Sequence, residues 1–187
     1  KANSSIGSAN NKASITNKGT FKNLGNVVAS IIKNESGKTL TNDNSITTDS
    51  IDNAGTVNGT GNLTTAGGNN TGSISQGSLN NTGNLNHSGS IVVNTITNSG
   101  SIQGNGGVNG SLTLKSGNSS NTGSMTVGSF TNEAASTLTG NGNLTISNGG
   151  SNAGNISQNN ITLNGTSFTN NGTLTSNGNF TNNTTLS

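Results

Sequence analysis

The sequence contains no proline, no cysteine, no tryptophan and no tyrosine. The lack of proline suits an architecture in which nearly every backbone N–H enters a hydrogen-bonded ladder, because proline would delete a donor there. The lack of cysteine excludes disulfides and thiolate metal sites, and it leaves the redox compartment undetermined. With 25% hydrophobic and 2% aromatic residues, the 187-residue chain has too little apolar side chain for a thick two-layer core.

Charge is equally scarce. Only 6% of the residues are charged and the formal net charge is +2, so self-repulsion does not hold this chain open as it does many disordered proteins. Arginine, the residue best suited to bind phosphate, is absent, and nucleic acid is therefore not an expected partner. No run approaches the roughly 18 apolar residues of a membrane span, and no signal peptide opens the chain. Because the first residue is Lys1, we interpret the chain as a mature product or an excised segment whose export signal, if any, lies outside it.

A short repeat runs through the sequence: an apolar residue, a polar pair containing Asn, a Gly and a second apolar residue. Its clearest copies are residues 15–21 (ITNKGTF), 51–57 (IDNAGTV), 96–102 (ITNSGSI) and 168–174 (FTNNGTL). A third apolar residue follows about five or six positions later, as from Val57 to Leu63. The spacing of Leu138, Ile156 and Leu174 predicts a repeat unit of about 18 residues.

The spacing of apolar residues favours strands over helices. They are separated mostly by two, five or six positions, and Gly or Asn interrupts every few residues. Runs such as 111–114 (SLTL) and 143–146 (NLTI) alternate apolar with polar, as strands with one buried face do. One coil of such strands cannot bury its apolar side chains alone, whereas stacked coils bury a continuous narrow column. On the outside, Thr, Ser and Asn are expected to hydrogen-bond to their counterparts one coil along.

The sequence therefore predicts an all-β fold, a parallel β-helix (β-solenoid) with coils of about 18 residues. A single solenoid segment is expected over residues 1–187. Within it, residues 1–50 form a less regular, lysine-rich end, and residues 51–187 carry the regular repeats.

The repeats at 96–102 and 168–174 resemble the shaft of filamentous-haemagglutinin-type exoproteins and related autotransporter passengers. The resemblance covers most of residues 50–187. It implies a right-handed parallel β-helix on a bacterial surface, exported through an outer-membrane β-barrel transporter, with adhesion or contact-dependent delivery as its task. The Asn-Pro motifs of the family's amino-terminal secretion domain have no counterpart in this proline-free chain.

Side chains that could perform chemistry are few, and no catalytic, cofactor-binding or metal-binding residue is predicted. The acidic residues are Glu35, Asp43, Asp49, Asp52 and Glu133. Asp43, Asp49 and Asp52 could form a calcium site or a carboxylate pair, but no calcium-binding motif is present and we expect them on solvated loops. The single imidazole, His87, has only Asn, Ser and Gly as sequence neighbours, so we expect it to be exposed and inert.

Two further segments invite a functional interpretation. The Gly-rich run 104–110 lacks the Gly-Lys-Ser/Thr ending and the following helix of a phosphate loop, and is predicted to be a coil-corner loop. Most of the lysines lie in the first forty residues: Lys1, Lys12, Lys18, Lys22, Lys33 and Lys38. They could attach the chain to an acidic glycan or cell surface, but we favour a solvated end that blunts the edge of the solenoid.

The leading hypothesis is a non-catalytic structural and adhesive protein, extracellular or on the bacterial cell surface. Its expected partners are a host or bacterial cell-surface glycan or protein, the export transporter and, by end-to-end association, other copies of itself. Loops at 103–123 and 64–78 are the candidate contact points.

Two alternatives remain open. An ice-binding solenoid would need Thr-x-Thr pairs aligned on one flat face at nearly every coil, and the pairs considered for this role are Thr39/Thr41, Thr137/Thr139 and Thr173/Thr175. A carbohydrate-active β-helix enzyme would need a cleft with at least two acids within about 10 Å of each other. Asp43, Asp49 and Asp52 are the candidates for that cleft.

Overall fold

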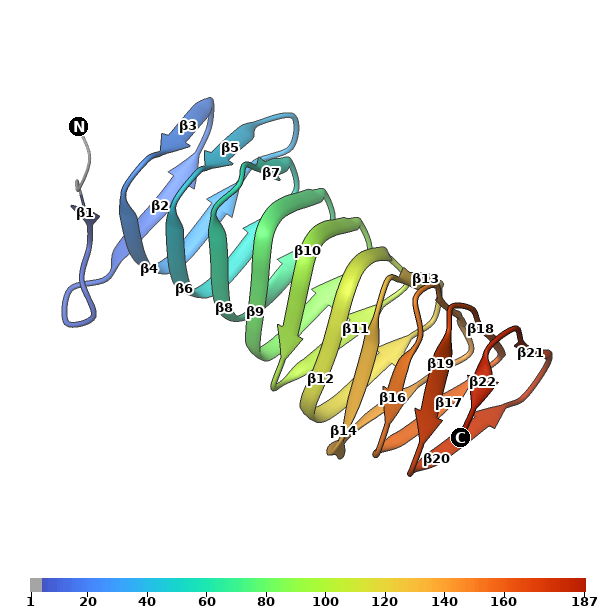
Figure 1. Cartoon of the computed structure of the whole chain (residues 1–187). Helices are drawn as coiled ribbons and strands as arrows, with labels where there is room; N and C mark the ends of the chain where they lie inside the picture. Colours follow the sequence, from blue (N-terminus) through green and yellow to red (C-terminus); the bar gives the residue numbers. More distant parts are fainter. Residues whose placement is uncertain (1–4) are drawn as a thin grey trace.

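Short polar–apolar–polar triplets build the strands of this chain, because successive side chains in a strand point to opposite faces. In β15 (Asn143–Ile146), Leu144 and Ile146 are buried whereas Asn143 is exposed. The computed structural model describes residues 5–187. Figure 1 shows these residues wound into a single stack of coils, with β1 near one end and β22 near the other.

The described residues form 22 strands and no helix. The strands are β1 (Ser5–Ile6), β2 (Ala13–Asn17), β3 (Thr20–Asn23), β4 (Asn26–Asn34), β5 (Thr39–Asn42), β6 (Ser45–Asn53), β7 (Thr56–Asn58), β8 (Asn62–Asn70), β9 (Ser73–His87), β10 (Ser90–Asn98), β11 (Ser101–Gly104), β12 (Gly107–Asn121), β13 (Ser124–Val127), β14 (Phe130–Thr139), β15 (Asn143–Ile146), β16 (Gly150–Asn152), β17 (Asn155–Gln158), β18 (Asn160–Leu163), β19 (Ser167–Asn170), β20 (Thr173–Ser176), β21 (Phe180–Asn182) and β22 (Thr185–Leu186).

Except at the two ends of the stack, each strand pairs in parallel with strands of the coil before it and of the coil after it. β4, for example, pairs with β2 and with β6, and β6 pairs in turn with β8. The stack has about 11 coils. Equivalent residues lie 17 positions apart for Asn17 and Asn34, and 19 apart for Asn23 and Asn42. The predicted parallel β-solenoid is thus confirmed, with coil lengths close to the predicted value.

Three columns of inward side chains form most of the core, one for each face of the coil. We name each column, and the face it lines, after one of its first residues. The Ile15 column contains Ile15, Ile32, Ile51, Gly68, Leu85, Ile102, Ser119, Leu138, Ile156 and Leu174. The Phe21 column contains Phe21, Leu40, Val57, Ile74, Ile91, Val108, Met125, Leu144, Ile161 and Phe180. The Val27 column contains Val27, Ile46, Leu63, Leu79, Ile96, Leu112, Phe130, Gly150, Phe168 and Leu186.

The columns explain how so few apolar residues hold the fold together. Side chains in the middle of the stack, such as Leu63 and Ile91, are completely buried. Each has an apolar neighbour above and below, so no coil buries its own apolar side chains alone. At roughly 25 cal/mol per Å² of apolar surface removed from water, this sharing between neighbouring coils is the main force that stacks them.

Gly150 shows how tightly the coils approach each other. It lies in the Val27 column between Phe130 and Phe168, the two largest buried side chains. A Cβ atom at this position would lie only 1.9 Å from the Phe130 carbonyl oxygen. The glycine therefore permits a close approach between the backbones of neighbouring coils.

The segments predicted to form contact loops, 103–123 and 64–78, belong largely to strands, so this prediction is wrong. β11 and β12 cover most of the first segment, and β8 and β9 cover most of the second. Glycine in these segments permits close approach between coils rather than a bulge: a Cβ atom at Gly110 would lie 2.0 Å from the Val93 carbonyl oxygen. Over residues 5–187 the structure has no helix of the length and hydrophobicity that a membrane span requires.

Candidate functional site

A ladder of buried asparagine side chains runs along the corner that follows the Ile15 column. Asn17 Nδ2 donates to Asn34 Oδ1, Asn34 Nδ2 to Asn53 Oδ1, and Asn53 Nδ2 to Asn70 Oδ1, each at 2.8 Å. All four side chains are at most 5% exposed. We call these residues the buried amide ladder.

The ladder has one direction throughout, because every amide also donates to a backbone carbonyl in the next coil. These second bonds join Asn17 to Thr39 O, Asn34 to Thr56 O, Asn53 to Ser73 O and Asn70 to Ser90 O, over 2.9 to 3.2 Å. Carbonyl oxygens only accept, so the Nδ2 side of each amide must face forward along the stack. The side-chain oxygens must then face backward.

The sequence-based prediction placed stacked Asn side chains on the outside of the coils and missed this ladder. The repeat nevertheless indicates it, through the spacing between the core residue and the Asn. In the triplet Ile15-Thr16-Asn17 the first and third residues share one side of the strand, so an Asn two positions after a core residue also points inward. The same parity holds for Ile32 with Asn34. Asparagine can occupy these inward positions because amides stacked one strand spacing apart satisfy each other.

Where a glycine interrupts an Asn ladder, a longer side chain bridges the gap. Asn42 Nδ2 donates to Gln76 Oε1 at 2.7 Å, two coils along, and Gly59 lies in the coil between them. Asn121 Nδ2 likewise donates to Gln158 Oε1 at 2.9 Å across the coil of Gly140. The extra methylene of glutamine supplies the additional reach.

His87 takes the next place in the buried amide ladder, and the prediction that it is exposed is wrong. It pairs in register with Asn70, and only 3% of its surface is exposed. Asn70 Nδ2 lies 3.1 Å from His87 Nδ1, and His87 Nε2 lies 2.9 Å from Gly107 O. Desolvation by this burial lowers the pKa of the imidazole. An imidazole fits here because residues 104–107 of the next coil are Gly-Asn-Gly-Gly. A Cβ atom at Gly106 would lie 2.5 Å from Nε2.

From the coil of Ile46 onward, two rows of residues flank the Val27 column on the outside of the coils, and their side chains are short and polar except at Gly149. One row precedes the column residues and contains Ser45, Asn62, Ser78, Thr95, Ser111, Ser129, Gly149, Ser167 and Thr185. The other follows them and contains Thr47, Thr64, Asn80, Thr97, Thr113, Thr131, Ser151, Thr169 and Ser187. Neither row contains a charged residue. We call the two rows together the hydroxyl face.

The Thr-x-Thr pairs singled out from the sequence do not all lie on one face. Thr39 and Thr41 flank Leu40 of the Phe21 column, whereas Thr137 and Thr139 flank Leu138 of the Ile15 column. The third pair, Thr173/Thr175, also belongs to the Ile15 column. The more regular rows on the hydroxyl face escaped sequence reasoning because many of their triplets read Ser-x-Thr or Thr-x-Ser.

The three aspartates do not converge, and Asp49 and Asp52 lie in strand β6 rather than on the predicted loops. Asp43 follows β5, and its Oδ2 lies 3.5 Å from Lys22 Nζ. Asp49 belongs to β6, and its Oδ1 lies 2.6 Å from Lys12 Nζ. Asp52 points outward from the Ile15 face and accepts a hydrogen bond from Asn69 at 3.1 Å. Among residues 5–187, no group of three or more His, Cys, Asp or Glu side chains could hold a metal ion.

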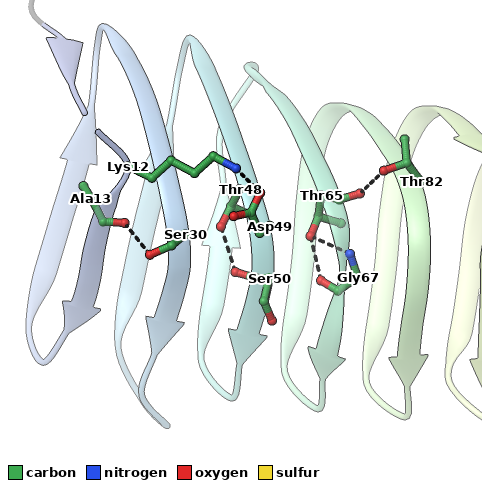
Figure 2. A network of polar contacts seen from close by, with 9 residues as sticks. All are labelled: Lys12, Ala13, Ser30, Thr48, Asp49, Ser50, Thr65, Gly67 and Thr82. Atoms are coloured by element: carbon green, nitrogen blue, oxygen red, sulfur yellow. Dashed lines mark hydrogen bonds and ion pairs between the residues drawn. The ribbon is translucent and has the colours of Figure 1, made fainter. Parts of the chain in front are cut away.

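Figure 2 shows how Lys12 reaches over the coil of Ser30 to meet Asp49. At the same corner, Thr48 Oγ1 donates to Ser50 O at 2.8 Å and Thr65 Oγ1 donates to Gly67 O at 2.6 Å. The lysine-rich end thus holds two ion pairs between coils. Lys1 lies outside the described residues.

The Gly-rich run 104–110 forms a shorter turn than the predicted corner loop. Gly104 ends β11 and Gly107 begins β12, so only Asn105 and Gly106 lie between strands. Beside it is an open depression of about 500 Å³, whose lining includes Asn69, His87 and Gln103. Besides His87, its lining consists of glycine and of residues with amide or hydroxyl side chains, without a carboxylate.

Comparison of the chain with protein-family models, with curated proteins and with solved structures found no match.

Proposed function

We propose that this chain is a non-catalytic structural segment of an extracellular protein, a stiff shaft that mediates attachment at a bacterial cell surface. The observation that carries the proposal is the continuity of the stack. Three inward columns link each coil to the next, and the buried amide ladder reinforces the coils from Asn17 to Asn70, so bending the rod would separate side chains in several columns at once. With coils about 4.8 Å apart, the stack is roughly 50 Å long.

The outer surface supports the same proposal. It consists mainly of short uncharged side chains, and only 6% of all residues are charged. The resemblance of the repeats to filamentous-haemagglutinin-type shafts points the same way. Under this proposal the partners are a cell-surface glycan or protein and, during export, an outer-membrane transporter.

The test is to label the native protein on the cells that produce it. Immunogold electron microscopy with an antibody against the hydroxyl face should place the label outside the outer membrane, and negative staining of purified material should reveal thin rods. Binding of the fluorescently labelled chain to intact cells and to a glycan array then tests attachment. Label confined to the cell interior, or compact round particles, would contradict the shaft.

A second candidate function, ice binding, is favoured by one observation, the hydroxyl face. Its side chains repeat about every 4.8 Å along the stack, and the two rows are about 6.6 Å apart along each strand. A regular array of hydroxyl groups can order a layer of water. The absence of charge on both rows suits such a layer, since a charged side chain would reorganise the water around itself.

Thermal hysteresis of the purified chain tests ice binding. The double substitution Thr97→Lys and Thr113→Lys should abolish it by inserting two long charged side chains into one row. The matched control is Thr126→Lys with Thr145→Lys on the Phe21 face, which should leave the hysteresis unchanged. Absence of hysteresis in the unmodified chain, or equal loss in both double variants, would reject this function.

A further inference from the structure

His87 is the only ionisable side chain in the buried amide ladder, and both of its ring nitrogens are engaged. Gly107 O can only accept, so Nε2 carries the proton and donates to it. The Asn70 amide nitrogen can only donate, so Nδ1 is unprotonated and accepts. The ladder therefore selects the neutral imidazole with its proton on Nε2.

A second proton on Nδ1 would face the hydrogens of the Asn70 amide. Rotating that amide by 180° would not relieve the conflict, because its nitrogen would then face the Asn53 nitrogen instead. Relief would require all four asparagines from Asn17 to Asn70 to rotate together, and each would lose its bond to a backbone carbonyl in the next coil. The direction of the whole ladder thus opposes protonation of its last member.

No neighbouring charge compensates for a protonated imidazole. The strands that pair with β9, namely β7, β8, β10 and β11, contain no Asp, Glu, Lys or Arg, and β9 itself contains none. β12, which supplies Gly107, contains only Lys115, and that residue follows Leu114 at a different corner of the coil. The nearest carboxylate along the outer amide row, Asp52, is reached only through Asn86 and Asn69.

The buried amide ladder is also interrupted at the coil that follows His87. Gly104 takes the ladder position after His87, so the side-chain ladder stops and resumes only at Asn121. The His87–Gly107 bond is the side-chain link that crosses this gap in the ladder. His87 also belongs to the lining of the open depression described above.

We propose that the step between His87 and Gly107 is an acid-sensitive joint of the solenoid, closed while the imidazole is neutral and opened locally by its protonation. The ligand is the proton, and the joint lies where the buried amide ladder is interrupted, while the buried side chains of Asn81, Asn98 and Ser119 link the same coils at another corner. This inference does not depend on the proposed function.

The sign of the pH dependence follows from burial. The ordinary pKa of histidine is 6.5, and desolvation lowers it in the folded chain. The open state therefore binds more protons at mildly acidic pH, so the closed joint loses stability as the pH falls from about 6.5 toward the folded-state pKa. Above about pH 7 the joint is insensitive to pH.

Hydrogen exchange of the full chain tests the joint. Protection factors, corrected for the intrinsic pH dependence of exchange, should fall by up to about tenfold per pH unit below pH 6.5 in the coils around residues 85–107. They should stay constant in the coils around Ile32 and Ile156. In H87Q, which keeps an amide in the ladder but cannot titrate, the local loss should be absent.

Because the chain contains a single histidine, an NMR titration of its ring protons reads this group directly and needs no variant. A folded-state pKa below 6.5, together with local loss of protection, supports the joint. A pKa at or above 6.5 overturns it, as does loss of protection spread evenly over all coils. The same pH dependence in a folded H87Q variant would also overturn it. If H87Q does not fold, the wild-type titration and exchange map decide.

Discussion

Replacing Asn53 by alanine cuts the buried amide ladder in its middle. Asn53 accepts a hydrogen bond from Asn34 at 2.8 Å, and it donates to Asn70 Oδ1 at 2.8 Å and to Ser73 O at 2.9 Å. The backbone pairing of β6 with β4 and β8 does not involve the side chain. Alanine should therefore remove the ladder contacts while preserving the strand.

The expected loss of stability is about 2–4 kcal/mol. A typical hydrogen bond contributes about 0.5–1.5 kcal/mol net, and a buried polar atom that loses its partner costs about 1–3 kcal/mol. Asn70 Oδ1 is such an atom, because it accepts from Asn53 in a side chain that is completely buried. Asn34 is less affected, since its Nδ2 keeps the bond to Thr56 O.

Guanidinium denaturation followed by far-ultraviolet circular dichroism measures this loss, and Asn69→Ala is the matched control. Asn69 belongs to an outer row with similar geometry, bonded to Asp52 at 3.1 Å and to Asn86 at 3.0 Å. It is exposed, so water replaces these partners and the control should lose less than about 1 kcal/mol. Equal shifts of the two denaturation midpoints, with unchanged m-values, would refute the reasoning that the ladder contributes to stability because it is buried.

Three further predictions concern single positions. Gly150→Ala should destabilise by more than about 3 kcal/mol, because its Cβ would overlap a backbone oxygen; the control Gly107→Ala has no atom within 4 Å of the added carbon and should be nearly neutral in the same denaturation assay. Thr65→Asn should stabilise by about 1 kcal/mol, because it supplies a donor to Asn81 Oδ1, which is buried without a partner; a lower thermal midpoint would contradict this. Lys12→Ala should cost less than about 1 kcal/mol, and the cost should shrink in high salt, because its ion pair is partly exposed; a salt-independent loss of stability would be inconsistent with that reasoning.

The solenoid could be predicted from the sequence because its main determinants are local and repeated. Triplets such as Asn143-Leu144-Thr145 specify a strand with one inward side chain, and their recurrence at nearly constant spacing specifies coils of nearly constant length. The thin core follows from the same counting, since each triplet contributes one apolar side chain. The Gly-rich segments were misread as loops because composition alone does not distinguish a turn from a close approach between coils.

The surroundings of His87 and the hydroxyl face were decided by the stacking of coils. Coil lengths vary, since register partners are 16 positions apart for Leu63 and Leu79 but 20 apart for Phe130 and Gly150, so the face on which a given Thr lies depends on the sum of all preceding coils rather than on its own neighbours. The contact between Asn42 and Gln76, and the ion pair between Lys12 and Asp49, join residues two coils apart. By itself the sequence determined the strand pattern and the repeat, because these follow from the alternation of side chains along an extended backbone. Only the tertiary structure decided which polar side chains meet in the interior, because that depends on which residues the register places directly above one another.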